Sequence, residues 1–195
     1  MTNISKIEQI LGAKPIEPVR EQINGKRHYI VREIQEAPMV SVTSVISDVV
    51  SKPALVNWGK NLGISAGLET LKGYVGTYIT ENILDEFKDD AKVKLAELST
   101  SAADYGTKAH SLIEAIINGE NPEIPMEFNP VIEGFRNWQE KNDINLILSE
   151  MCVYSINLQV AGTLDALGTK GDKIILFDWK TSNGFYEEMA LQCGG

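Results

Sequence analysis

The chain of 195 residues is 43% hydrophobic and 23% charged, which suits one globular domain, or one domain with a helical elaboration. Its formal net charge of −9 has the wrong sign for a protein that coats nucleic acid with a basic surface. No apolar run approaches the roughly 18 residues that span a bilayer, and the N-terminus lacks the pattern of a signal peptide. We therefore expect a cytoplasmic protein without a membrane partner. The two cysteines, Cys152 and Cys193, are too few for a disulfide framework and are expected to be reduced thiols.

Residues 1–40 are expected to form an N-terminal elaboration that contains a helix and a β-hairpin. The spacing Ser5-x-x-Glu8 resembles a capping box and predicts a short helix near residues 6–11. Alternating apolar residues over 17–34 flank Asn24-Gly25, a dipeptide typical of two-residue hairpin turns. The elaboration is therefore predicted to add a hairpin to the domain that follows.

The next segment, up to Asn118, is mainly helical in pattern. Ser41 is a suitable cap for a helix that extends to about Val50. Pro53 suits the first turn of a second helix, because proline lacks the N–H that is unpaired there. The pattern predicts breaks near Gly73–Gly76 and near Ser99–Ser101.

After Asn118 the periodicity changes from helical to alternating. Asn129-Pro130 begins a helix that ends near Lys141. Three successive strands follow at residues 146–156, 160–168 and 173–180. A last helix is predicted from about Phe185, with Asn183 as its cap and acidic residues in its first turn. This order predicts an α+β fold with a small sheet, in which helices pack on the strands.

The hairpin between the last two predicted strands places acidic and basic residues together. With Gly171-Asp172 as a two-residue loop, Lys170 faces Lys173 and Asp165 lies opposite Asp178. Directly opposed residues lie roughly 5 Å apart at Cβ. Lys180 is two residues after Asp178 and therefore points to the same face. The register predicts two carboxylates and one ammonium on a single, otherwise apolar face.

Two facing carboxylates destabilise a sheet unless positive charge compensates them. Lys180 would offset one charge, and Mg²⁺ would offset the rest, because hard divalent cations prefer oxygen ligands. Such a site can cleave phosphodiesters: the metal polarises the phosphate and acidifies a water, and a lysine stabilises developing charge. The acidic balance of the chain is compatible with a site of this kind. The alternative is that both aspartates face solvent and Lys180 pairs with one of them.

The same residues resemble a known family. The segments Gly162-Thr-Leu-Asp165 and Phe177-Asp-Trp-Lys-Thr-Ser182 resemble the G-x-x-D … D-(Y/W)-K-(T/S) signature of RecB-like PD-(D/E)XK nucleases, a group that includes Cas4-like nucleases and many phage exonucleases. Gly106–His110 resembles the G-x-x-x-H helix of the family, and Gln192 stands where its Q-x-x-x-Y element begins. Ser41–Ile46 and Lys52–Trp58 resemble the N-terminal part of phage members. The resemblance covers most of residues 41–195.

The resemblance implies a Mg²⁺- or Mn²⁺-dependent deoxyribonuclease with a three-layer α/β/α restriction-endonuclease-like core. In that case Asp165, Asp178, His110 and the backbone carbonyl of Trp179 would bind the metal. Lys180, together with Asp165, Asp178 and Gln192, would be catalytic. The implied substrate is DNA, and the implied setting is phage or bacterial recombination or replication, with partner proteins from that process. The chain ends before the tyrosine of Q-x-x-x-Y, so the resemblance implies that the nuclease domain, residues 41–195, is incomplete at its C-terminus.

Two other functions are compatible with the sequence. One is a non-catalytic DNA-binding or assembly module of the same fold, which the acidic charge and the short C-terminal element favour. The other is a plain interaction domain, which predicts that the carboxylates lie apart. The sequence leaves open the roles of Glu114 and Glu150, the oligomeric state, the polarity of cleavage and the strand state of the substrate.

Overall fold

A computed structural model describes residues 17–50, 52–182 and 184–194. The chain divides into two units, one formed by residues 1–51 and 109–195 and the other by residues 52–108. The helix predicted near residues 6–11 lies outside the described residues. The division predicted at residue 40 stays a prediction. Within the described residues no helix combines the length and apolar character that crossing a membrane requires.

The predicted N-terminal hairpin is confirmed. Strand β1 (Val19–Ile23) pairs antiparallel with β2 (Lys26–Ile30). The turn between them is Asn24-Gly25, and both residues have the positive φ that this kind of turn requires (52° and 75°). The short strand β3 (Met39–Ser41) pairs with β2 and leads directly into helix α2 (Val42–Val49). The hairpin is thereby joined to the main sheet.

Ser41 stands at the predicted cap position of α2 but does not cap it. Its side chain makes no capping hydrogen bond to the helix. Instead the Ser41 hydroxyl lies 2.7 Å from the Thr43 hydroxyl, within hydrogen-bonding distance. The first turn of α2 also contains no acidic residue, so neither Ser41 nor an acidic side chain of this turn compensates the N–H groups at this end.

The second unit contains α3 (Pro53–Lys72) and the first part of α4 (Glu81–Ile117). The predicted break near Gly73–Gly76 is confirmed, and Gly76 has a φ of 86°. The break predicted near Ser99–Ser101 is wrong, because α4 continues through it for 37 residues in all. No glycine or proline stands between Glu81 and Asp104, and the serines and threonine alone reduce helix propensity too little to end a helix.

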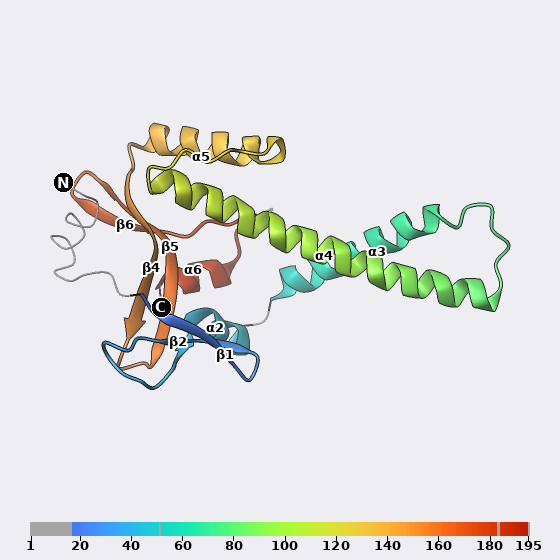
Figure 1. The fold of residues 1–195 in the computed structure, drawn as a ribbon, viewed down its shortest axis with the longest axis horizontal. Helices are drawn as coiled ribbons and strands as arrows, with labels where there is room; N and C mark the ends of the chain where they lie inside the picture. Colours follow the sequence, from blue (N-terminus) through green and yellow to red (C-terminus); the bar gives the residue numbers. More distant parts are fainter. Residues whose placement is uncertain (1–16, 51, 183, 195) are drawn as a thin grey trace. The chain divides into compact units, whose positions relative to one another are not determined.

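The second half of the chain follows the predicted order. A 3-10 turn η1 (Met126–Phe128) leads into α5 (Asn129–Asn142), which ends at Asp143 in the left-handed conformation. Three strands follow, as Figure 1 shows: β4 (Asn145–Ser155), β5 (Val160–Lys170) and β6 (Lys173–Phe177). The last helix, α6, is Glu187–Gly194. Its predicted cap, Asn183, lies outside the described residues.

The predicted register of the last hairpin is confirmed. Lys170 pairs with Lys173, and the ladder continues to the pair Ala166 and Phe177. Strand β6 then ends, three residues before the predicted boundary, so Asp178 and Lys180 follow the strand instead of lying within it. The register nevertheless places Asp165 and Asp178 next to each other, immediately beyond the last pair.

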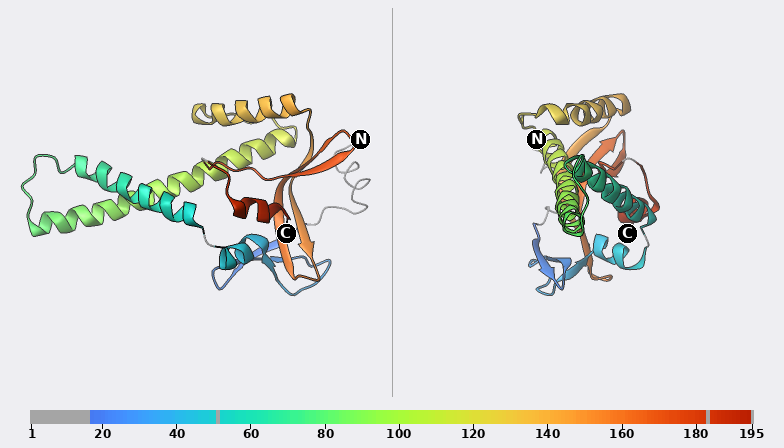
Figure 2. Two further views of the ribbon diagram at one scale, coloured as in Figure 1. Left: turned by 180° about the vertical axis from the view of Figure 1, so that it is seen from behind. Right: turned by 90° about the vertical axis from the view of Figure 1, so that its right-hand side faces the viewer.

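The strands form one six-stranded sheet in the order β1-β2-β3-β5-β4, with β6 also paired to β5. Strand β3 runs parallel to β5, whereas the other pairs are antiparallel. The predicted α+β class with a mixed sheet is therefore confirmed. Helices α2 and α6 lie side by side in this unit (Figure 2).

Two clusters of buried side chains stabilise the sheet. One lies between β4 and β5 and comprises Ile147, Leu148, Leu164 and Leu167. The other joins the N-terminal strands to β4 and β5 and comprises Tyr29, Val31, Met39, Cys152 and Ala161. Cys152 is a buried free thiol, as predicted, and Cys193 is an exposed one. Gly168 permits β5 to pack closely against β4, because a Cβ there would lie 2.9 Å from the carbonyl oxygen of Asn145.

Candidate functional site

A cavity of about 220 Å³ opens beside the middle of strand β5. Along one edge, β5 pairs with β4 from Val160 to Thr169. Along the other edge it pairs with β3 at residues 160–161 and with β6 at residues 166–170. No strand of the described residues pairs with residues 162–165 on this second edge, and all four line the cavity. The cavity therefore lies where β3 and β6 separate.

Asp165 lies at this unpaired part of β5, with 14% of its side chain exposed. Its Oδ2 accepts a hydrogen bond of 2.6 Å from the backbone N–H of Trp179. Its Oδ1 lies 3.6 Å from Nδ1 of His110, on α4. The helix and the segment after β6 thus both contact one carboxylate. The fold brings together His110 and Asp165, two residues expected as metal ligands, and that role stays a prediction.

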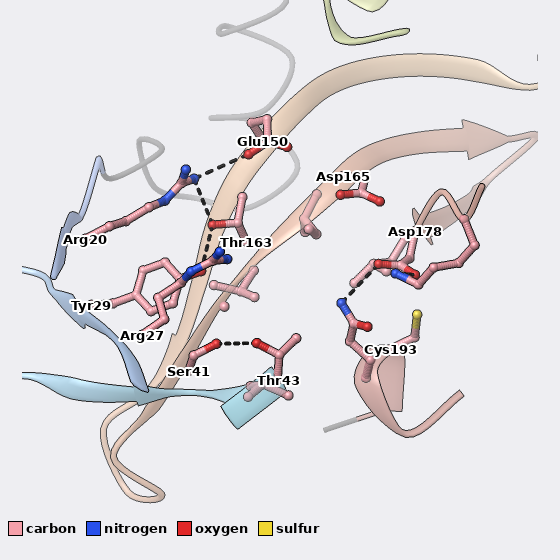
Figure 3. A pocket seen from close by; sticks show the side chains of 17 residues that line it. Arg20, Arg27, Tyr29, Ser41, Thr43, Glu150, Thr163, Asp165, Asp178 and Cys193 are labelled. Atoms are coloured by element: carbon pink, nitrogen blue, oxygen red, sulfur yellow. Dashed lines mark hydrogen bonds and ion pairs between the residues drawn. The ribbon is translucent and has the colours of Figure 1, made fainter. Parts of the chain in front are cut away.

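Asp178 is the second carboxylate of the cavity, and 10% of its side chain is exposed. Its Oδ2 forms an ion pair with Nζ of Lys180. Its Oδ1 accepts a hydrogen bond of 3.1 Å from Nε2 of Gln192, which α6 contributes. Figure 3 shows Asp178 facing α6, with Cys193 beside it. The structure thus brings Lys180 and Gln192 to the same carboxylate, and their predicted catalytic roles stay predictions.

The residues around Asp178 alternate between two environments. Leu176, Asp178 and Lys180 line the cavity. Phe177 and Trp179 point away from it and stack on each other with ring centroids 5.6 Å apart. Both rings also pack edge-to-face against Trp138 of α5, at centroid distances of 5.3 Å. This aromatic cluster, which also includes Phe135, holds the segment after β6 in an extended course, so that Asp178 and Lys180 face the cavity.

Glu150 is a third carboxylate that lines the cavity. The ladder of β4 with β5 places it across from Asp165, between the pairs of Ser149 with Ala166 and of Met151 with Leu164. Its φ is 54°, a left-handed conformation that costs of order 1–3 kcal/mol in a residue other than glycine. Its Oε2 lies 3.3 Å from Nη2 of Arg20. Glu150 therefore pairs with an arginine of the N-terminal hairpin and not with Lys180.

Glu114 lies one turn after His110 on α4 and is half buried. Burial and the nearby carboxylate of Glu150 raise the pKa of Glu114 above its ordinary value of 4.5. Glu114 is thus close to the third carboxylate of the cavity, and it gives up its proton less readily than an exposed glutamate does.

The cavity also contains residues that the sequence pattern did not indicate as site residues. They are contributed by the hairpin, the start of α2 and α6, and they comprise Arg20, Arg27, Tyr29, Ser41, Thr43 and Cys193.

Within the described residues, no group of three or more His, Cys, Asp and Glu side chains is arranged to hold a metal ion. Metal binding by the Trp179 carbonyl stays a prediction. The backbone N–H of Trp179 donates a hydrogen bond to Asp165.

The contact with Asp165 raises the pKa of His110 above its ordinary value of 6.5, although burial opposes the shift. Lys180 and Asp178 also act on this imidazole, with opposite signs. His110 therefore holds its proton more tightly in the folded protein than in the unfolded chain. The resulting stabilisation is fully present below pH 6.5 and is lost as the pH rises through the raised pKa.

We expect a His110→Asn variant to lack this pH-dependent stabilisation. Urea unfolding of both proteins in EDTA, across a pH series from the acidic side of 6.5 to the alkaline side, measures it. The excess stability of the wild type over the variant should be largest at acidic pH and should decrease as the pH rises. An excess that is independent of pH would contradict a raised pKa of His110 beside Asp165.

Comparisons with protein-family models, curated proteins and solved structures find no match for this chain. Its function must therefore be inferred from the residues of the cavity and their chemistry. The relevant features are the two shielded aspartates with their donors, the third carboxylate Glu150 across the strand pair, and two arginines of the N-terminal hairpin, Arg20 and Arg27.

Proposed function

We propose that this chain is a metal-dependent nuclease that hydrolyses phosphodiester bonds in DNA, an exonuclease of the RecB-like PD-(D/E)XK type acting in phage or bacterial recombination or replication. The three-layer restriction-endonuclease-like core is part of the same proposal. The observation that carries it is one cavity lined by Asp165, Asp178, Lys180 and Gln192, with His110 at the first carboxylate. These residues come from four separate parts of the chain, namely α4, β5, the segment after β6 and α6, in the pattern that the family resemblance implies.

The donor set of the cavity is chemically suited to Mg²⁺ or Mn²⁺. Asp165 and Asp178 offer the oxygen ligands that hard cations prefer, and the imidazole of His110 suits Mn²⁺ better than Mg²⁺. Both carboxylates are shielded from solvent and are compensated by protein donors. A divalent cation would take over this compensation, with Asp165, Asp178, His110 and the Trp179 carbonyl as its ligands. Lys180 or Gln192 would then have to release part of Asp178.

When bound, the cation would supply Lewis-acid polarisation of the scissile phosphate and promote ionisation of the attacking water. The chain's own residues do the positioning. The N–H of Trp179 fixes Asp165, and Gln192 fixes Asp178. Lys180 is close enough to the carboxylates to orient the water and to stabilise negative charge that develops on the phosphate.

The test is cleavage of end-labelled single-stranded and double-stranded DNA in Mg²⁺, Mn²⁺ or EDTA. The proposal expects cleavage with either metal and none in EDTA, and the products report the polarity. An RNA substrate of the same sequence tests the inference of DNA. A folded protein that cleaves no substrate under any of these conditions would contradict the proposal.

A second candidate is a non-catalytic DNA-binding or assembly module of the same fold. The observation that favours it is that Asp165 and Asp178 are already satisfied by protein donors, while no metal-binding group of three is arranged among the described residues. Calorimetric titration with Mg²⁺ and Mn²⁺ separates the two candidates. The module predicts DNA binding that EDTA leaves unchanged and no binding of either cation.

A further inference from the structure

The second unit of the chain, residues 52–108, buries few of its side chains. It consists of α3 and the first part of α4, which follow each other as a helical hairpin (Figure 1). Within this unit, all of whose residues the structure describes, Ala66 is the single buried side chain. Helices in proteins gain most of their stability from the packing of an apolar face. The unit therefore has apolar surface that its own fold leaves in contact with solvent.

One side of α3 is apolar and faces away from the buried Ala66. Ile64, Leu68 and Leu71 recur at intervals of four and three residues, which places them on one face of the helix. They lie roughly 140–160° around the helix axis from Ala66. We call this side the outer face of α3; it comprises Lys60, Ile64, Gly67, Leu68 and Leu71, with Val56 at its border. Its four large apolar side chains are 48–62% exposed.

Glycines make the outer face accessible to a second helix at close range. A Cβ at Gly67, or at Gly63 one turn earlier, would meet no atom within 4 Å. Glycine destabilises a helix interior relative to alanine, and its usual structural benefit is that another backbone can approach closely. Among the described residues no segment occupies this space, so it is available to a helix from outside the chain.

The exposed area of the outer face suits a pair of identical helices. At roughly 100 Å² for each half-exposed large side chain, its apolar residues and Lys60 offer on the order of 500 Å². Asn57 and Asn61, at the edges of the face, raise this to about 700 Å², close to the ~800 Å² that each partner contributes to a standard interface. In a symmetric dimer the same surface serves both partners, so this one face is sufficient.

Lys60, the charged residue of the outer face, determines the orientation of such a pair. In a parallel pair, Lys60 and its copy would lie at the same level and repel each other. In an antiparallel pair with a two-fold axis at the level of residues 65–66, the two lysines lie about 17 Å apart along the helix. That separation exceeds the Debye length of ~8 Å at physiological ionic strength. The arrangement sets Ile64 of one copy against Gly67 and Leu68 of the other.

We propose that the outer face of α3 binds the outer face of a second copy of this chain, with the two helices antiparallel in a symmetric dimer. The partner is a second copy because the face combines projecting apolar side chains with an open glycine and has the area of one half of a standard interface. The proposal is independent of the proposed nuclease activity, since the cavity residues belong to the first unit and the outer face belongs to the second.

Sedimentation equilibrium of the full chain tests the dimer, in the presence of a reductant because Cys193 is an exposed thiol. The wild type should be dimeric at about 100 µM, since interfaces of standard size have micromolar or tighter dissociation constants. Leu68→Glu places a charge at the centre of the interface and should raise the dissociation constant at least about 100-fold. The control is Val93→Glu, at an equally exposed position of α4 (60% against 59%). It should stay within about threefold of the wild type.

Gly67→Leu is a second variant, chosen because the isolated chain accommodates it. The added Cβ meets no atom within 4 Å, and leucine is a better helix former than glycine. At concentrations where the chain is monomeric, its thermal unfolding temperature should be unchanged or raised. The bulk on the outer face should nevertheless raise the dissociation constant at least about 10-fold. Gly134→Leu, at an exposed glycine of α5 with equally open space, should leave dimerisation unchanged.

A wild type that is monomeric at every concentration would overturn the proposal. Lower stability of Leu68→Glu than of Val93→Glu would then show that the face is covered within its own chain, and equal stability would leave it to a different partner. An assembly larger than two, or equal weakening by both glutamate variants, would also overturn it. Spin labels on Asn57→Cys, in a Cys193→Ser background, report the orientation. The antiparallel pair separates them by about 25 Å or more along the helix, and a much shorter distance contradicts it.

Discussion

Replacement of Lys180 by alanine is expected to lower the rate of metal-dependent DNA cleavage by about 10²- to 10³-fold, the usual cost of removing one donor that stabilises charge in a transition state. Nζ of Lys180 is paired with Asp178, and 27% of its side chain is exposed. In the proposed mechanism it would lie at the reacting phosphate. Single-turnover cleavage of end-labelled DNA, with enzyme in excess, measures the chemical step directly.

The matched control is Lys173→Ala, which removes an exposed lysine from β6, outside the cavity. It should leave the rate nearly unchanged. Calorimetric titration separates catalysis from metal binding: without Lys180, Asp178 loses a competing cation, so affinity for Mg²⁺ or Mn²⁺ should be retained or increased. Wild-type rates in a folded Lys180→Ala protein would exclude Lys180 from the chemistry.

Replacement of Phe135 by alanine is expected to lower the free energy of unfolding by about 3–5 kcal/mol, the usual cost of truncating a buried aromatic residue. Phe135 is 6% exposed. Its ring packs edge-to-face on Trp179 at 5.4 Å and stacks on Trp138 at 6.2 Å. Urea unfolding followed by tryptophan fluorescence measures the change, since Trp138 and Trp179 report from within the cluster.

The matched control for Phe135→Ala is Arg136→Ala, at the next and exposed position of α5. It should change the free energy of unfolding by less than about 0.5 kcal/mol. Because the cluster holds Trp179 between Asp178 and Lys180, Phe135→Ala should also slow cleavage under conditions in which it remains folded. A variant as stable as the wild type would show that α5 does not anchor the segment after β6.

The local features of the fold could be predicted from the sequence. The turn residues Asn24-Gly25 and Gly171-Asp172 fix the two hairpins, because tight turns accept few residue types. The second turn also fixes the register that places Asp165 beside Asp178. The continuity of α4 was not predicted, since serine-rich positions within a long helix resemble a boundary when neighbouring contacts are unknown.

The composition of the cavity depended on pairings between distant parts of the chain. Asp178 and Lys180 are neighbours in sequence, and alternation along an extended chain alone places them on one side. His110, Gln192 and Arg27 reach the same cavity only through the packing of α4, α6 and the hairpin around β5. The early end of β6 likewise follows from the aromatic cluster, which holds Trp179 while its N–H bonds to Asp165.

The sequence by itself thus determined the acidic pair, its lysine and their register, because short-range turn geometry and strand periodicity depend on adjacent residues. The tertiary structure decided where the sheet opens. Strands β3 and β6 both pair with one edge of β5 and leave residues 162–165 between them. That gap arises from the parallel pairing of β3, a contact between residues more than a hundred positions apart, which no local pattern specifies. Tertiary packing then brings Arg20 and Arg27 of the hairpin to the same cavity as the carboxylates.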